Sequence, residues 1–280
     1  MLQLGRINTL TALRRTSVGF FLNVSEHGDP KDDVLLPNKY VPNDLAVGDE
    51  IDVFIYTDSE DRPVATTRTP AVQRDEFAAL RVVAVTHAGA FLDWGLEKDL
   101  LVPYREQSRP MDVGRWYVVF VYVDEDTNRL VASSKVDKFL DPDVRDLYEG
   151  DEVQLLAYER TDLGLNVIIN NRYKGLVYHN ELFRVVRPGD RLIGYIKRVR
   201  DDDRVDVSLQ RPGFEGIESN AQRILIELRA AGGFLALTDN SPPDVIYKTL
   251  EMSKKTFKRA VGTLYKERKI VLEEEGIRLV

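Results

Sequence analysis

A pattern that occurs three times in the first three-quarters of the chain constrains the fold more than any other feature of the 280 residues. Each copy has a glycine inside a short apolar stretch, a second glycine in a polar turn, and an arginine after an acidic segment. The second glycine comes 29, 25 and 25 residues after the first, and the arginine comes 14, 15 and 15 residues after the second. This fixed order indicates an internal repeat whose copies fold alike. The markers, copy by copy, are Gly19, Gly48 and Arg62, then Gly89, Gly114 and Arg129, then Gly164, Gly189 and Arg204.

Each copy has the pattern of several short β-strands. Apolar residues alternate with polar ones, as at Ile51, Val53 and Ile55, and the acidic stretches 58–61, 124–126 and 201–203 are typical of hairpin turns. Five short strands in roughly 65–70 residues, with a bend-making glycine inside one strand, fit a small closed barrel. No amphipathic helix separates the strands, which excludes a parallel α/β fold. We therefore predict a mainly β chain with three five-stranded OB-type barrels, in residues 1–70, 71–145 and 146–213.

The remaining segment, residues 214–280, has the periodicity of helices. Residues 212–216 interrupt the strand pattern, apolar residues then recur at helix spacing, and Gly232-Gly233 ends the first helix. Pro242-Pro243 opens a second helix, and Ser253 is placed to cap a third. Residues 270–280 have the pattern of a hairpin. Three helices and a hairpin predict a winged-helix domain, with the third helix buried through Phe257, Ala260, Val261 and Leu264.

The composition excludes several functional classes. The chain has no cysteine, which removes disulfides and thiol chemistry and favours a reducing cytoplasm. No apolar run approaches the roughly 18 residues of a spanning helix, and the first six residues fit a strand better than a signal peptide. His27, His87 and His179 stand at unmatched offsets, and no phosphate loop or nucleophile elbow occurs. We expect no enzyme activity, cofactor, metal or small-molecule substrate, and we expect the acidic residues 201–203 to form a solvated turn.

The charge is distributed unevenly along the chain. The net charge is −7, and by predicted domain it is −4, −3, −1 and +1 from the first to the last. Positive charge therefore gathers toward the C-terminal half. Local fields, not the sum, steer a polyanion, so nucleic-acid binding remains open.

Two stretches resemble the signature segments of the ribosomal S-one RNA-binding domain. They are residues 88–95, Ala-Gly-Ala-Phe-Leu-Asp-Trp-Gly, and residues 175–182, Gly-Leu-Val-Tyr-His-Asn-Glu-Leu. Gly189-Asp190 and the series Asp201, Arg204 and Ser208 are similar to the closing strands of that domain. The resemblance spans about three-quarters of the chain, is strong in the second and third copies and is degenerate in the first. It implies single-stranded RNA binding on one barrel face.

The resemblance also implies which side chains would contact RNA. A stacking aromatic falls on Phe21 and Phe91 but on Asn166 in the third copy, and the signature histidine falls on Tyr178. The first stacking aromatic is absent from all three copies, which implies weak binding by each barrel and affinity from several sites together. The RNA-binding residues that we predict are Phe21, Arg62, Phe91, Arg129, Lys174, Tyr178, Lys197, Arg198, Arg200 and Arg204. The alternatives are barrel packing for the two phenylalanines and turn salt bridges for Arg62, Arg129 and Arg204.

The third helix of the C-terminal domain carries a cationic face. It consists of Lys254, Lys255, Lys258 and Arg259, for which the alternative is an ordinary solvated face. The order of three S-one-like barrels and a winged helix resembles the bacterial conserved virulence factor B family of RNA-binding regulators. That resemblance implies a non-catalytic, post-transcriptional regulator that binds single-stranded RNA. The alternatives are a transcription regulator on duplex DNA and a scaffold on the ribosome or a decay complex.

Overall fold

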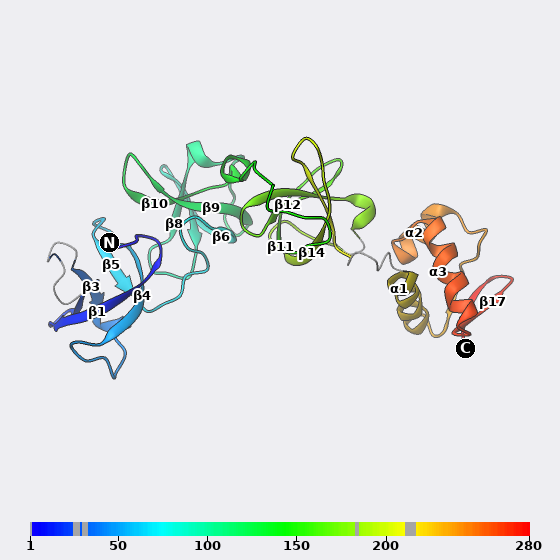
Figure 1. Ribbon diagram of the computed structural model, residues 1–280, viewed down its shortest axis with the longest axis horizontal. Helices are drawn as coiled ribbons and strands as arrows, with labels where there is room; N and C mark the ends of the chain where they lie inside the picture. The colour runs from blue at the N-terminus through cyan, green and yellow to red at the C-terminus, as the bar shows by residue number, and fades with distance from the viewer. Residues whose placement is uncertain (1, 25–28, 30–32, 183–184, 211–216) are drawn as a thin grey trace. The chain divides into compact units, whose positions relative to one another are not determined.

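The computed structural model describes residues 2–24, 29, 33–182, 185–210 and 217–280. The chain forms two compact units, Met1–Asp141 with Pro188–Asp190, and Pro142–Arg187 with Arg191–Val280. The first unit contains two β-domains, and the second contains a third β-domain and the helical domain (Figure 1). The predicted interruption at 212–216 and His27 lie outside the described residues. No helix among the described residues is long and apolar enough to cross a membrane.

The first repeat is a closed five-stranded barrel with strand order β1-β2-β3-β5-β4. All neighbouring strands are antiparallel except β3 and β5, which pair in parallel at Leu35 and Val64. The inward side chains, among them Leu10, Phe20 and Val53, form one core. The strands are β1 (Ile7–Arg15), β2 (Gly19–Asn23), β3 (Val34–Pro37), β4 (Glu50–Thr57) and β5 (Pro63–Thr66), with the 3-10 helix η2 (Asn38–Tyr40) after β3.

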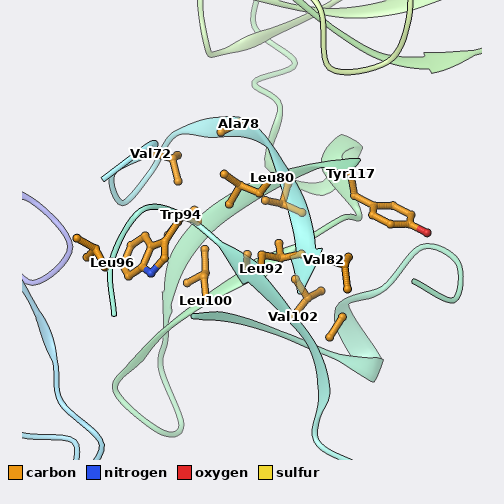
Figure 2. Close-up of a cluster of buried hydrophobic side chains, with 14 of the residues drawn as sticks. Val72, Ala78, Leu80, Val82, Leu92, Trp94, Leu96, Leu100, Val102 and Tyr117 are labelled. Carbon is orange, nitrogen blue, oxygen red and sulfur yellow. The ribbon is translucent and has the colours of Figure 1, made fainter. Parts of the chain in front are cut away.

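The second repeat has the same strands in the order β10-β9-β6-β7-β8. Its edge strands β8 and β10 lie side by side but form no hydrogen-bonded ladder, so the barrel is closed by packing and not by pairing. Figure 2 shows its core, in which Leu80, Leu92 and Val102 meet. The elements are β6 (Phe77–Thr86), β7 (Gly89–Asp93), β8 (Leu100–Pro103), β9 (Trp116–Asp124), β10 (Arg129–Ser133), η3 (Tyr104–Glu106) and η4 (Val136–Phe139).

The third repeat is again a closed barrel, ordered β11-β12-β13-β15-β14. Val153, Val167 and Ile196 are among the residues that fill its core. The three repeats thus confirm the predicted S-one-like fold. The elements are β11 (Glu152–Arg160), β12 (Gly164–Ile169), β13 (Tyr173–Tyr178), β14 (Arg191–Val199), β15 (Val205–Ser208) and the 3-10 helix η5 (His179–Glu181).

The first glycine of each copy stands where two backbones approach closely. A Cβ atom at Gly19, Gly89 or Gly164 would lie 2.0, 2.2 or 2.1 Å from a carbonyl oxygen of the next strand. Real Cβ atoms do not come so near a backbone oxygen, so only glycine fits. The shared spacing of the repeat therefore reflects one steric requirement met three times.

The acidic segments form the predicted hairpin turns. The Asp58 carboxylate accepts hydrogen bonds from the backbone N–H groups of Glu60 and Arg62, at 2.9 and 3.0 Å. Asp124 caps the β9–β10 turn in the same way and also accepts from Thr127. Burial alone would raise the pKa of Asp124, but these hydrogen bonds and one from Arg105 outweigh it and hold that pKa below its usual value.

The C-terminal domain is a winged helix, as predicted. Pro243 stands at the first turn of the second helix, and the Ser253 hydroxyl accepts from the backbone N–H of Thr256 at 3.1 Å. Phe257, Ala260, Val261 and Leu264 are all buried. The elements are α1 (Ile217–Ala230), α2 (Pro243–Leu250), α3 (Lys254–Lys266), β16 (Phe234–Leu235), β17 (Ile270–Glu273) and β18 (Gly276–Leu279), with sheet order β16-β18-β17. The sequence does not predict the short strand β16, because two residues are too few to show an alternation of apolar and polar side chains.

The first two barrels share a core. Phe54 and Tyr56 of β4 point away from the first barrel and are buried in one cluster with Trp94 and the interior of the second barrel. The rings of Phe54 and Trp94 meet edge to face, with their centroids 5.6 Å apart. Burial and the neighbouring Tyr40 raise the pKa of Tyr56 above its usual value. An apolar joint of this kind makes the first two repeats one folded unit.

Candidate nucleic-acid interface

The outer surface of the second strand of each barrel carries the predicted stacking position. Phe21 lies on β2 opposite Leu35, Phe91 lies on β7 opposite Leu101, and both rings are half-buried. Asn166 on β12 takes the equivalent place, where its amide donates a 3.0 Å hydrogen bond to the Glu159 carboxylate. Two of the three copies therefore have a half-buried aromatic ring at this position, and the third has a buried amide that is paired with a carboxylate.

A cation covers the ring in the first barrel. The guanidinium carbon of Arg14, on the neighbouring strand β1, lies 4.4 Å from the centroid of Phe21. The same guanidinium forms a 2.6 Å ion pair with the buried Asp33. Burial would raise the pKa of Asp33, but hydrogen bonds from Asn23 and Arg14 hold it below its usual value. Arg14 was missed by sequence reasoning, because only the β1–β2 register brings it over Phe21.

The third barrel brings together two of the predicted groups, Tyr178 and Arg200, and places Asp206 beside them. Tyr178 ends β13, and its hydroxyl accepts a hydrogen bond from Arg200, whose guanidinium carbon is 5.9 Å from the ring centroid. Arg200 also donates two hydrogen bonds to one Asp206 oxygen, at 2.9 and 3.0 Å. This contact raises the pKa of the Arg200 guanidinium above its usual value. A ring that carries a fixed cation at its edge is a suitable stacking surface for a base beside a phosphate.

The other predicted cations of this barrel differ in their surroundings. Lys197 is paired with Glu181 of η5, whose second oxygen accepts a 2.8 Å hydrogen bond from Ser208. Arg198 is exposed and forms no ion pair with any described residue. Lys174 is exposed on β13. Arg198 is therefore the most available of these cations for a phosphate.

The three hairpin arginines are all in ion pairs. Arg62 contacts Asp58 and Glu60 of its own turn, and Arg204 contacts Asp202 at 3.4 Å in the turn between β14 and β15. Arg129 instead reaches Asp61 of the first barrel, so it belongs to the joint between the first two barrels. The contacts of Arg62 and Arg204 are the turn salt bridges of the alternative interpretation, whereas the partner of Arg129 lies outside its own turn. At each arginine a phosphate would have to compete with a carboxylate. No group of three acidic or histidine side chains in the described parts of the chain is placed to hold a metal ion.

The exposed face of α3 carries the other predicted contacts. Lys255, Lys258 and Arg259 are exposed, and Lys254 is half-buried at the first turn. Lys258 lies 3.5 Å from Asp239, in an exposed pair that contributes little to stability. The face is thus cationic and mostly solvated.

Comparison with known proteins agrees with the fold. The family model for the S1 domain, the S-one domain named above, matches residues 4–68 and 76–135, and the model for the CvfB-like winged helix domain matches residues 222–279. These domains indicate nucleic-acid binding.

Relatives of this chain occur in bacteria. YitL of Bacillus subtilis (strain 168) is 30% identical over 96% of this chain and 91% of its own length. Conserved virulence factor B of Staphylococcus aureus (strain USA300) is 27% identical over 85% of this chain and 81% of its own. A crystal structure of a multidomain protein with nucleic acid binding domains from Streptococcus pneumoniae TIGR4 aligns over 99% of this chain and 98% of that one, with 25% identity and a TM-score of 0.45.

Proposed function

Because this chain belongs to the conserved virulence factor B family, we propose that it is a non-catalytic protein that binds single-stranded RNA and regulates gene expression after transcription. The observation that carries the proposal is the Tyr178–Arg200 pair on the third barrel, a ring with a fixed cation beside it. The other two barrels also have a ring on the outer surface. It is Phe21, covered by Arg14, in the first barrel and Phe91 in the second.

The proposed ligand is single-stranded because stacking needs exposed base faces. Each base stacked on a protein ring contributes about 1–3 kcal/mol, and phosphate contacts make the affinity fall with salt. The hairpin arginines and Lys197 are already paired with carboxylates, so each barrel alone would bind weakly. Tight binding would then need several barrels on one RNA strand. In the cell we expect the protein in the cytoplasm, where it would alter the translation or decay of the bound RNA without cutting it.

The test compares two tyrosines of the third barrel region, the half-buried Tyr178 and the exposed Tyr148. Tyr178→Ala removes the proposed stacking ring, while Tyr148→Ala removes a ring that is 67% exposed in the segment before β11. Binding of a fluorescein-labelled uridine 15-mer is followed by anisotropy in 50 mM salt. We expect Tyr178→Ala to weaken binding by about 5-fold or more and Tyr148→Ala to leave it unchanged. If both variants bind with the affinity of the wild type, Tyr178 does not contact the RNA, and the observation that carries the proposal fails.

The exposed cations of α3 favour a second proposal, binding of duplex DNA by the winged helix. Lys255 and Arg259 stand one turn apart on the solvent side of that helix. If this surface is the working one, Lys255→Ala with Arg259→Ala should abolish a preference for duplex DNA over single strands. A protein that binds duplex DNA no better than single-stranded RNA contradicts this alternative. Docking on the ribosome or a decay complex would instead show as co-sedimentation that survives nuclease treatment.

A further inference from the structure

The chain has two tryptophans, and they lie in opposite environments. Trp94 is 3% exposed in the joint of the first two barrels, whereas Trp116, the first residue of β9, is 63% exposed. The fourth strand of the other two barrels begins instead with Glu50 and Arg191. The same barrel position is therefore built without a ring in both other copies, so the fold does not require Trp116.

The residue opposite Trp116 is a cation. In the β6–β9 ladder Trp116 pairs with Arg81, and directly opposed side chains of an antiparallel pair have Cβ atoms roughly 4.5–5.5 Å apart. Arg81 is exposed and makes no ion pair or hydrogen bond with another described side chain. Its opposite neighbour on β7 is Asp93, whose carboxylate accepts from the backbone N–H of Gly95 at 3.0 Å. The other nearby cation, Arg115, pairs with Asp112 at 3.3 Å.

Trp116 and Phe91 lie on the same outer surface of the second barrel. On β7, Ala90 and Leu92 are fully buried, so Phe91 and Asp93 point outward. Asp93 lies opposite Arg81 on β6, and Arg81 lies opposite Trp116 on β9, so these three side chains form one row across the outer surface. Two strand spacings and one two-residue step along a strand separate Phe91 from Trp116, a distance of roughly 12 Å. One strand of nucleic acid can contact both rings over such a distance.

We propose that Trp116 and Arg81 form a second nucleobase site on the second barrel, in which a base of single-stranded RNA stacks on the indole while Arg81 binds the adjacent phosphate. The site rests on the proposed function and deepens it, because it extends the path of the RNA from Phe91 across β6 to β9. An exposed indole beside an unpaired guanidinium is complementary to a base and its phosphate. Purely apolar contact with a protein would leave that guanidinium uncompensated.

The direct readout is the emission of Trp116 in the full-length protein. A base stacked on the indole quenches that emission, while Trp94 is shielded from solvent. Titration with a uridine 15-mer in 50 mM salt should quench the wild type, and the quenching should be lost in Trp116→Phe. Unchanged quenching in that variant would show that the quenched emission comes from Trp94, and it would contradict the proposed base-stacking site at Trp116.

Affinity gives the second readout. Trp116→Ala should raise the Kd about 5- to 150-fold, Trp116→Tyr should bind within about 3-fold of the wild type, and Arg81→Ala should lower the salt slope by about one. The matched control is Val113→Ala, which removes a nearby apolar side chain that is 60% exposed and should leave the Kd unchanged. Melting temperatures of all variants should match the wild type.

The two proposals fail in different ways. If Tyr178→Ala weakens RNA binding while Trp116→Ala binds like the wild type, the RNA-binding function stands and the Trp116 site is wrong, leaving that ring for a protein contact. If the wild type does not bind the 15-mer in 50 mM salt, the proposed function fails and the Trp116 site fails with it.

Discussion

Replacing Trp94 by alanine should destabilise both of the first two barrels and leave the third untouched. The Trp94 side chain is almost fully buried between the barrels, and its indole N–H donates a 2.6 Å hydrogen bond to the carbonyl oxygen of Lys98. Truncating a buried tryptophan costs about 3–5 kcal/mol. The lost edge-to-face contact with Phe54 and the unpaired carbonyl add to this cost. We expect a total of about 4 kcal/mol or more, a large share of the stability of one domain.

Amide hydrogen exchange separates the barrels in one experiment. The backbone N–H of Ile55 is hydrogen-bonded in the first barrel, that of Val121 in the second and that of Ile196 in the third. A loss of about 4 kcal/mol lowers protection roughly 10³-fold where exchange requires unfolding of the unit. We expect Ile55 and Val121 to lose protection together, while Ile196 keeps it.

The control is the other tryptophan. Trp116→Ala removes an exposed side chain and should change stability by less than about 0.5 kcal/mol. If Trp94→Ala lowers protection at Val121 and leaves Ile55 unchanged, the first two barrels unfold separately, and the argument for a shared core is refuted.

Three further predictions test local features. Gly164→Ala should prevent stable folding of the third barrel, seen as lost protection at Ile196, because its Cβ would lie 2.1 Å from the Val177 carbonyl oxygen; native-like protection would contradict the steric argument. Gly262→Ala, in mid-helix with open space around a Cβ, should stabilise the winged helix by about 0.5–1 kcal/mol in thermal unfolding, and a destabilised variant would show an unrecognised contact. Asp124 has a folded-state pKa below its unfolded value, so the stability that its carboxylate contributes is present above about pH 4 and is lost as pH falls through the folded pKa. The wild-type protein should therefore have a higher unfolding midpoint at pH 5 than at pH 3, and Asp124→Asn should make this difference smaller. An unchanged difference in the variant would contradict this prediction.

The repeat made most of the fold predictable from sequence. Gly19, Gly89 and Gly164 mark the same close approach of two neighbouring strands in every copy, so their repeated spacing indicates the barrel directly. The buried stripe of α3 was predictable for the same reason, because helix periodicity decides which side chains face the core.

The surroundings of the predicted site residues could not be predicted, because they depend on contacts between distant parts of the chain. Arg129 belongs to the same repeat pattern as Arg62, yet only Arg129 reaches across to the neighbouring barrel, at Asp61. The alternation around Phe54 indicates a strand, but it does not reveal that the outward side chain is covered by another domain. Trp116 was likewise missed, because alternation alone does not distinguish a buried ring from an exposed one.

Titrations with three nucleic acids decide between recognition of RNA and recognition of DNA. The full-length protein is titrated into labelled single-stranded RNA, single-stranded DNA and duplex DNA of equal length, from 50 to 300 mM salt. The proposed function predicts tightest binding to single-stranded RNA, with log Kd rising linearly with log salt concentration. Tightest binding to duplex DNA would contradict it and assign the function to α3, and no binding to any of the three at 50 mM salt would contradict nucleic-acid recognition altogether.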